Sequence, residues 1–445
     1  MNVQKDRDVV PEALVIGAGI AGMQAALDIA QKGFKVHLVE KDPSIGGHMA
    51  QLDKTFPTLD CSACIITPKM VDTANHPNIH LLTYSEVMEV KGSAGNFKVK
   101  IRKKPTYVLS DKCTGCGACM EACMLKKGVP SEFNEGLSRR RAIYVPFPQA
   151  VPLKATIDPN ACLFLSKGKC KKSCMEACGT GAISFEQPEE IIEENVGAIV
   201  VAAGFDLFDP RLKPEFGYKA YPNVLHGLEF ERLCSASGPT QGEIIVEGKK
   251  PADVVFVHCV GSRDKTVGNE YCSRVCCMAT AKQAHLLRDK IPDARITVLY
   301  MDVRAFGKGF EEFYERVQKE RIVYRRGNPS EIYRKNGKLV VRAEDTLLGE
   351  PFELETDLVV LAAGITPRKE EAALEDLLGL ERSPDRFYRE ASSFDPVLTH
   401  REGIFLAGCC QGPKDIPDTV AQASGAASMA CAILAKGRKG EVRTS

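Results

Sequence analysis

A strand–turn–helix–strand unit near the N-terminus is the sequence feature that most constrains the fold. An apolar strand (13–16) runs into a glycine-rich turn and a helical pattern that reaches residue 31, and a second strand (35–39) ends at an acid. The first glycine permits the tight bend, the second lets the backbone approach a pyrophosphate, and the third lets the helix pack on the sheet. The helix N-terminus binds phosphate and the acid binds a ribose hydroxyl, so the unit predicts a dinucleotide site. Its residues are Gly17, Gly19, Ile20, Ala21, Gly22 and Glu40, with Lys41 next to the acid.

Several later glycine-ended segments resemble those of two-dinucleotide-binding flavoproteins. A glycine pair follows Glu40 closely, buried strands at 198–204 and 358–364 end in small-residue turns, and a last strand (403–408) precedes a helix expected over 419–435. In that superfamily the two middle strands mark the crossings between an FAD domain and an inserted second domain, and the last helix points its N-terminus at the flavin ring. An Asp that holds the ribityl chain there is replaced by Cys409 here. The resemblance implies FAD binding by Gly46, Gly47, Ala203, Gly204, Gly364, Gly408, Cys409 and Val420.

A second Rossmann-like unit is expected at about 250–345. Strands begin at Asp253 and Arg295, and a helix is predicted between them at 279–288. The turn after the first strand (258–263) lacks the glycine fingerprint of NAD(P) sites. We therefore do not expect a nicotinamide cofactor in this unit.

Two cysteine runs predict a pair of [4Fe–4S] clusters. The first has the spacing of a bacterial ferredoxin, C-x2-C-x2-C-x3-C, and the second is a stretched version, C-x7-C-x3-C-x3-C. In such modules the fourth cysteine of each run reaches the other cluster. One cluster is therefore assigned to Cys113, Cys116, Cys119 and Cys178, and the other to Cys123, Cys162, Cys170 and Cys174.

A third group, C-x12-C-x3-C-C, begins in the turn where the nicotinamide fingerprint is missing. Its members are Cys259, Cys272, Cys276 and Cys277. From spacing alone, a metal site and a structural accident are both open. For Cys61 and Cys64, a cluster shared with a partner, a redox dithiol and spare core thiols are all open. The run 139–141 of three arginines indicates a solvated turn or a docking patch for an acidic partner.

Composition narrows the possible partners and the compartment. Lys and Arg number 59 against 58 Asp and Glu, a net charge of +1, which gives no electrostatic footprint for nucleic acid or an acidic membrane. No apolar stretch is long enough to span a bilayer. Residues 1–11 lack the apolar core of a secretory signal, so we expect a cytoplasmic protein whose 18 cysteines serve metal or redox chemistry.

Four segments carry a family resemblance. The sequences HCVGSRD (258–264), YCSRVCCMATAK (271–282), DCSACIITPKM (60–70) and FNEGLSRRRAIYVPFPQAVPLKATID (133–158) resemble the A subunit of heterodisulfide reductase, over essentially the whole chain. The related A subunit of the quinone-interacting membrane-bound oxidoreductase complex shares much of this signature. The larger members carry an extra N-terminal domain and a C-terminal ferredoxin, so this chain is similar to a short form.

The resemblance implies a thioredoxin-reductase-like α/β fold with FAD and an inserted dicluster ferredoxin module. It also implies that Cys259, Cys272, Cys276 and Cys277 ligate an unusual third [4Fe–4S] cluster. Lys282 matches a family lysine near the flavin N5, where it stabilises an anionic reduced flavin; the alternative is a solvated helix residue. The expected division is an FAD domain (1–110, 186–249 with a linker, and 346–445), the inserted module (111–185) and the second Rossmann-like domain (250–345).

The predicted function is that of an oxidoreductase subunit in anaerobic metabolism, active only with the other subunits of a heterodisulfide-reductase-like complex. A hydrogenase, formate dehydrogenase or NADH-oxidising module delivers electron pairs to the FAD, and the clusters carry single electrons onward, with flavin-based electron bifurcation as one option. Two alternatives remain: a non-bifurcating electron-wiring subunit of a quinone-linked complex, and a stand-alone FAD-dependent NAD(P)H:disulfide oxidoreductase. A homodimer within the complex is also left open.

Overall fold

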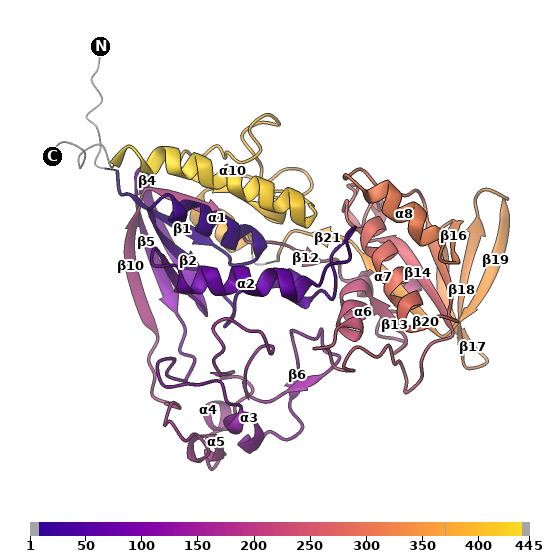
Figure 1. The fold of residues 1–445 in the computed structure, drawn as a ribbon, viewed down its shortest axis with the longest axis horizontal. Helices are drawn as coiled ribbons and strands as arrows, with labels where there is room; N and C mark the ends of the chain where they lie inside the picture. Colours follow the sequence, from indigo (N-terminus) through magenta and orange to yellow (C-terminus); the bar gives the residue numbers. More distant parts are fainter. Residues whose placement is uncertain (1–8, 370, 438–445) are drawn as a thin grey trace.

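Two parallel sheets and a small cysteine-rich module make up the computed structural model, which describes residues 9–369 and 371–437. Figure 1 shows one sheet with its helices next to the termini, the second sheet at the opposite end, and the module below them. The segment 1–11, on which the expected compartment rests, lies mostly outside the described residues. None of the described helices is both long and apolar enough to cross a membrane.

The first sheet is parallel, with the strand order β22-β11-β1-β2-β3. Helices α1, α2 and α10 pack on one face, and an antiparallel sheet, β10-β5-β4, packs on the other. The small side chains of α1, chiefly alanines, let it approach the strands and α10 closely. The bounds are β1 Glu12–Ile16, β2 Lys35–Val39, β3 Ile79–Leu82, β4 Ser85–Ser93, β5 Asn96–Lys103, β10 Glu190–Val196, β11 Ala198–Val201, β22 Ile404–Leu406, α1 Ile20–Gln31, α2 Ser62–Asn75 and α10 Ile416–Leu434.

The cysteine-rich module is inserted between two paired strands. Lys103 at the end of β5 lies opposite Glu190 at the start of β10, so the chain leaves and rejoins the antiparallel sheet at one place. Within the module, four cysteines belong to a small core with short apolar side chains. Its elements are α3 Ala118–Ala122, β6 Val129–Pro130, β7 Arg139–Arg140, β8 Ile143–Tyr144, β9 Thr156–Ile157, α4 Leu163–Lys167 and α5 Ser173–Glu176.

The second sheet is also parallel, in the order β13-β20-β14-β15-β16. Three helices cover one face and a three-stranded antiparallel sheet covers the other. Since β13 and β20 belong to this sheet, it extends beyond 250–345 on both sides. The bounds are β13 Val224–His226, α6 Gly227–Cys234, β14 Asp253–Val260, α7 Cys276–Lys290, β15 Arg295–Tyr300, α8 Phe310–Gln318, β16 Ile322–Arg326, β17 Pro329–Lys335, β18 Lys338–Asp345, β19 Glu350–Thr356 and β20 Leu358–Ala363.

Two short strands join the two sheets. The chain passes from the first sheet to the second through β12 and returns through β21, and the two strands pair antiparallel (Figure 1). The return leads into α9 on the antiparallel side of the first sheet. The bounds are β12 Asp206–Leu207, β21 Ile365–Thr366 and α9 Glu371–Leu378, with 3₁₀ turns at Gly47–Gln51, Pro210–Leu212, Pro214–Phe216, Lys265–Val267 and Gly408–Cys410.

Candidate functional site

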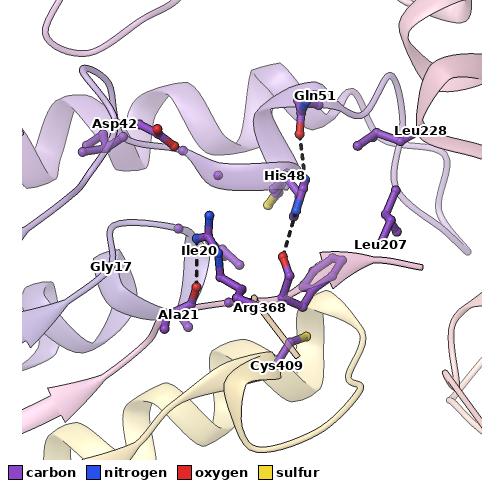
Figure 2. Close-up of a pocket in the computed structure, with 18 of the residues that line it drawn as sticks. Gly17, Ile20, Ala21, Asp42, His48, Gln51, Leu207, Leu228, Arg368 and Cys409 are labelled. Atoms are coloured by element: carbon purple, nitrogen blue, oxygen red, sulfur yellow. Dashed lines mark hydrogen bonds between the residues drawn. The ribbon is translucent and has the colours of Figure 1, made fainter. Parts of the chain in front are cut away.

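A cavity of about 1150 Å³ runs from the first sheet to the second. Its walls come from the β1–α1 turn, the segment after β2, the inserted module, α6, α7 and the N-terminus of α10. Figure 2 shows Gly17, Ile20 and Ala21 on one side, Cys409 on another, and Leu207 and Leu228 at the end next to the second sheet. Ligands of parallel α/β sheets bind at such strand ends, where neighbouring connections diverge.

The glycines of the β1–α1 turn have two different surroundings. Two of them pack against backbone atoms and have no room for a side chain, whereas the third faces the cavity. A Cβ on Gly17, whose φ is +96°, would lie 2.3 Å from the Ala202 carbonyl oxygen. A Cβ on Gly22 would lie 1.8 Å from the carbonyl oxygen of Gly17. Gly19, in contrast, faces open space and precedes a helix whose first N–H groups have no side-chain cap. The turn therefore offers bare backbone donors to an anion in the cavity.

Glu40 lies buried at the cavity edge after β2. Its carboxylate accepts hydrogen bonds from the amides of Ala18 (2.7 Å) and Asp42 (3.0 Å). Burial and the charge of Asp42 raise the pKa of Glu40, while the two amide bonds act in the opposite direction. The carboxylate thus ties β2 to the glycine turn and keeps acceptor capacity for a hydroxyl.

Most of the predicted FAD-binding residues line this cavity. They are Gly17, Gly19, Ile20, Ala21, Glu40, Lys41, Gly46, Gly47, Ala203, Gly204 and Cys409. Gly22, Gly364, Gly408 and Val420 do not line it, and the structure places these glycines against packed neighbours instead. Helix α10 begins at Ile416, earlier than expected, with Asp415 as its N-cap. Both residues line the cavity.

Among the polar cavity residues that the sequence prediction missed, three stand at different parts of the wall. His48 bonds Gln51 Oε1 (2.7 Å) and the Phe205 carbonyl oxygen (3.1 Å), as Figure 2 shows. Arg368 donates to the Ala203 carbonyl oxygen (3.1 Å). Arg140, which belongs to the run of arginines expected to be a solvated turn or docking patch, has a side chain only 11% exposed and also lines the cavity. His48 directly follows the Gly46–Gly47 pair, which is a signal that could have singled it out.

At the far end of the cavity, α7 contributes a buried lysine. The side chain of Lys282 is 2% exposed, so it is not a solvated helix residue. Its Nζ lies 2.7 Å from Glu231 Oε1 and donates to the Lys54 carbonyl oxygen at 2.7 Å. Two residues earlier in α7, the Thr280 hydroxyl is buried in the cavity wall and has no hydrogen-bond partner among the described residues. A lone buried hydroxyl fits a ligand whose polar edge reaches this end.

The third cysteine group borders the same end of the cavity. Cys259 ends up beside Cys272, Cys276 and Cys277, and Cys276 lines the cavity. Burial raises the pKa of Cys259 to about 12, with a further contribution from neighbouring Cys277. Four cysteines that interact electrostatically with one another around a helix N-terminus are an all-sulfur donor set that fits an iron–sulfur cluster.

The inserted module gathers its eight cysteines into two groups. Burial raises the pKa of Cys119 to about 11, and its other contributors are Cys113, Cys178 and Cys116. The same holds for Cys174, with Cys123, Cys162 and Cys170. The structure therefore brings together the two sets of four in which the last member of each run joins the other set. Each set is an all-sulfur donor set of the kind that holds a cubane.

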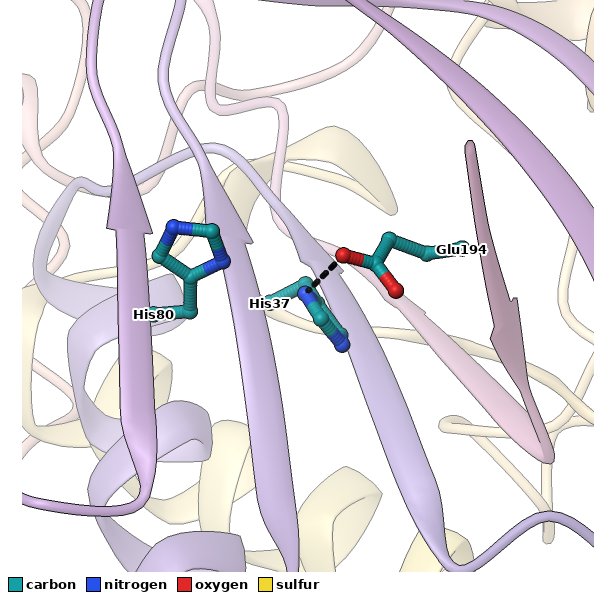
Figure 3. A group of neighbouring side chains, drawn as sticks. All are labelled: His37, His80 and Glu194. Carbon is teal, nitrogen blue, oxygen red and sulfur yellow. Dashed lines mark ion pairs between the residues drawn. The ribbon is translucent and has the colours of Figure 1, made fainter. Parts of the chain in front are cut away.

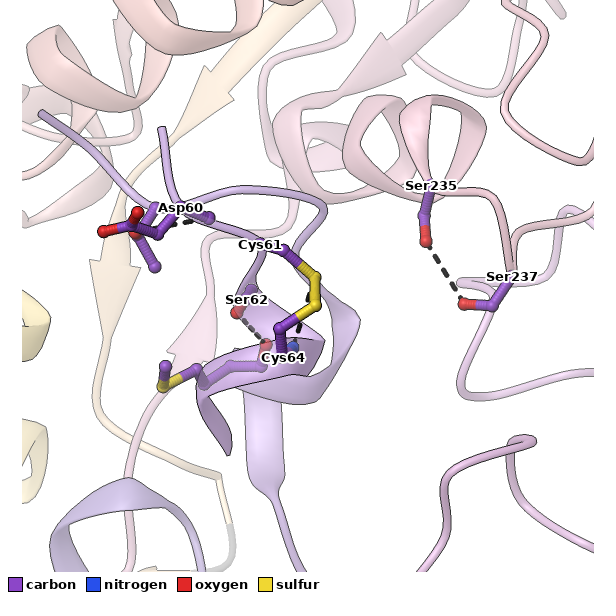
Figure 4. The surroundings of a disulfide bond; sticks show 8 residues. Asp60, Cys61, Ser62, Cys64, Ser235 and Ser237 are labelled. Carbon is purple, nitrogen blue, oxygen red and sulfur yellow. Dashed lines mark hydrogen bonds between the residues drawn. A yellow bond between two sulfur atoms is a disulfide. The ribbon is translucent and has the colours of Figure 1, made fainter. Parts of the chain in front are cut away.

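Cys61 and Cys64 form a disulfide at the start of α2 (Figure 4). Both residues are exposed, which excludes the spare core thiols, and Cys61 Sγ also accepts a hydrogen bond from the amide of Cys64 (3.2 Å). Of the alternatives left open, this pairing corresponds to the redox dithiol.

The first turn of the second Rossmann-like unit is filled by packing. A Cβ on Gly261 would lie 2.0 Å from the ring of Phe208, and Arg263 in the same turn pairs with Asp302 at 2.6 Å. Bare backbone next to open space, as at Gly19, is not found at Gly261. The turn gives no sign of a phosphate-binding site for a nicotinamide dinucleotide.

Comparison with known proteins supports both modules of the fold. Residues 15–76 match the family described as NAD(P)-binding Rossmann-like domain, and residues 106–123 match the 4Fe-4S binding domain family. Thioredoxin reductase from Lactococcus lactis has a TM-score of 0.53 at 15% identity and covers 96% of this chain and 99% of its own. T. acidophilum thioredoxin reductase has a TM-score of 0.51 at 14% identity, with 95% and 98% covered. The predicted fold class is confirmed.

Curated relatives are much more similar in sequence. The A subunit of the H(2):CoB-CoM heterodisulfide,ferredoxin reductase of Methanothermobacter thermautotrophicus is 54% identical over 96% of this chain and 64% of its own length. The iron-sulfur A subunit of the CoB--CoM heterodisulfide reductase of Methanocaldococcus jannaschii is 52% identical over 98% and 66%. A protein of Archaeoglobus profundus, named as similar to the A subunit of heterodisulfide reductase, is 49% identical over 97% and 67%. The chain thus spans about two thirds of the length of these relatives.

Proposed function

The chain belongs to the family of heterodisulfide reductase A subunits, and from this premise we propose that it is an FAD- and iron–sulfur-containing electron-transfer subunit of a heterodisulfide-reductase-like complex. It accepts electron pairs from a partner such as a hydrogenase, a formate dehydrogenase or an NADH-oxidising module. The Methanococcus maripaludis relative is named as the A subunit of an H(2)/formate:CoB-CoM heterodisulfide,ferredoxin reductase, which supports the first two donors. Electrons leave one at a time toward a disulfide-reducing or quinone-reducing partner.

One observation carries the proposal: a single cavity is bordered by the glycine turn at one end and by Cys276 and Lys282 at the other. The glycine turn and the N-terminus of α1 would hold the FAD pyrophosphate, Glu40 a ribose hydroxyl, and the N-terminus of α10 the other end. The three cysteine groups would hold one [4Fe–4S] cluster each. Bound FAD exchanges one or two electrons whereas a cubane exchanges one, which is the chemistry needed to convert electron pairs into single electrons.

The chain's own residues set the electrostatics of that cavity end. Lys282 is a buried cation held by Glu231, so it favours negative charge next to it when a ligand is reduced. Thr280 offers a hydroxyl that no protein group uses. Phe56 and Leu228 add apolar surface to the lining of the cavity.

Metal and flavin analysis after anaerobic purification tests the proposal. Three clusters predict about twelve iron and twelve acid-labile sulfide per FAD. Cys119→Ser, Cys174→Ser and Cys277→Ser should each lower the iron content by about four, since each removes a ligand from a different group. Cys431→Ala, outside the three groups, is the matched control and should keep all the iron. A protein with four iron atoms or fewer, or without flavin, contradicts the proposal.

A second candidate function, an FAD-dependent NAD(P)H:disulfide oxidoreductase, is favoured by the exposed Cys61–Cys64 disulfide. The packed turn at Gly261 speaks against its nicotinamide site. Anaerobic mixing of the isolated protein with NADH or NADPH separates the two. We expect the flavin absorbance near 450 nm to remain, and its rapid loss would favour the second candidate.

A further inference from the structure

Two histidines and a glutamate meet on the face of the first sheet that lies away from α1 and α2. His37 on β2 and His80 on β3 are directly paired in the parallel register, so their side chains lie side by side on one face. Their rings are 5.7 Å apart. Glu194 reaches toward them from β10 in the covering sheet, as Figure 3 shows. One ligand atom from each of the three residues lies within 4.8 Å of the others.

The orientation of the His37 ring is fixed from the opposite side. His37 Nε2 lies 2.8 Å from Glu12 Oε2, and Glu12 also forms an ion pair with Lys35. A carboxylate in an ion pair accepts hydrogen bonds, so Nε2 donates to Glu12 and Nδ1 is the ring nitrogen that faces the covering sheet. The side chain of His37 is 4% exposed, and its Nδ1 is buried without a hydrogen-bond partner among the residues that the structure describes.

Glu194 faces that nitrogen from the covering sheet. Glu194 Oε1 lies 3.7 Å from His37 Nδ1, which is too long for a hydrogen bond. A proton or a metal ion between the two atoms would satisfy the buried nitrogen, and His80 adds a third ligand atom that only a metal ion would use.

We propose that His37 Nδ1, His80 and Glu194 bind a zinc ion, with Glu12 as the positioning residue that orients His37. Two imidazole nitrogens and a carboxylate oxygen are a donor set suited to Zn²⁺. A carboxylate that accepts from the second nitrogen of a metal-bound histidine is the usual arrangement around such ions. His80 is exposed and the Glu194 side chain is 30% exposed, so both can rotate inward to the roughly 3.3 Å ligand separations of a tetrahedral site, and water can take the fourth position.

The site is separate from the redox cavity and would act on the framework. None of its three residues lines that cavity. Strand β10 is where the chain returns from the inserted module, so a zinc ion bound to Glu194 would fasten that return to the dinucleotide sheet. Zinc should therefore raise the thermal stability of the protein.

Zinc binding to the anaerobically purified holoprotein tests the proposal, with the iron–sulfur groups already loaded so that their cysteines do not compete. Zinc content after loading and buffer exchange should rise by one per chain. X-ray absorption at the zinc edge should show nitrogen and oxygen ligands only. His80→Ala and Glu194→Gln should weaken binding at least tenfold, and Glu12→Gln by about 10–100-fold. His400→Ala, a surface histidine elsewhere, is the control.

The readouts separate this site from other zinc binding. His80 is exposed, so its loss should leave folding and iron content unchanged while it removes the zinc-dependent rise in melting temperature. The proposal is overturned if the added zinc has sulfur ligands, or if His80→Ala binds zinc as the wild type does. It is also overturned if zinc stabilises the wild type and His80→Ala equally.

Discussion

Replacement of Lys282 by Met is the perturbation whose magnitude follows most directly from the structure. The side chains of Lys282 and Glu231 are 2% and 1% exposed. Without the ammonium, the Glu231 carboxylate keeps only neutral donors, the Gln283 side-chain amide at 2.8 Å and the Asp53 amide at 3.2 Å. Removal of one partner of a buried ion pair costs about 3–5 kcal/mol. Because two neutral donors remain, we expect a loss near the lower end, about 3 kcal/mol.

A second substitution shows whether this cost comes from the stranded charge. In the double variant Lys282→Met/Glu231→Gln the buried charge is gone, and the glutamine carbonyl oxygen in the place of Oε1 still accepts from Gln283, while the longer bond from the Asp53 amide to Oε2 is lost. We expect the double variant to be within about 1 kcal/mol of wild type, which corresponds to a coupling of about 2 kcal/mol or more. Lys290→Met, on the exposed end of the same helix, is the matched control and should change stability by less than about 1 kcal/mol.

Thermal unfolding of the anaerobic holoproteins, followed by far-UV circular dichroism, measures these differences. For a folding unit of roughly 150–250 residues, about 3 kcal/mol lowers the melting temperature by about 6–12 °C. A Lys282→Met protein that melts with the wild type, or a double variant less stable than the single one, refutes the argument from a buried pair.

Three further predictions follow from local geometry. Gly22→Ala should abolish FAD retention, because the added Cβ would lie 1.8 Å from the carbonyl oxygen of Gly17. The control is Gly425→Ala in α10, whose Cβ would lie at an ordinary 3.5 Å from the Val397 side chain, and it should retain both FAD and full stability. Flavin release and melting curves measure the two properties. Cys178→Ser and Cys113→Ser should remove the same cluster signal in electron paramagnetic resonance spectra, and the loss of two different signals would contradict the crossed ligand sets. Burial lowers the pKa of His226 in the folded protein, so the unfolded state binds more protons at acidic pH. The stability of the fold should therefore decrease as the pH drops below about 6.5. His226→Asn keeps a side-chain acceptor at the N-cap of α6, so it should weaken this pH dependence in melting curves recorded from about pH 7 to about pH 5.

The parts of the molecule that the sequence predicted are those fixed by local sterics. The turn between β1 and α1 needs glycines because Gly17 and Gly22 would otherwise collide with backbone atoms of their own unit. The cysteine runs of the inserted module likewise lie in short turns and helices, so their spacing is visible in the sequence. Such constraints involve residues that are close in the sequence, so the fold class could be predicted from the sequence and is confirmed.

Residues that reach the cavity from afar could not be predicted in this way. Arg368 enters through the return strand between the sheets, and Arg140 comes from the inserted module, where it pairs with Asp158 at 2.9 Å. Neither place in the cavity wall follows from the local sequence, even for Arg140 in its run of arginines, because each position depends on how separate segments pack. The boundaries of the second domain were wrong for the same reason. Strands β13 and β20 lie outside the expected range 250–345 and join its sheet only through tertiary packing.

The third cysteine group lies where a nucleotide-binding unit would bind phosphate. Cys259 lies at the end of β14, and Cys276 opens α7, so the sulfurs occupy the strand-end and helix-start positions that bind phosphate in a nucleotide-binding unit. Helix α7 has no side-chain cap, so its first N–H groups and its dipole favour anionic sulfur as they would favour phosphate. With Phe208 packed on Gly261, the dinucleotide has no room there. The same backbone framework therefore presents cysteines, in place of a phosphate-binding turn, at the edge of the cavity.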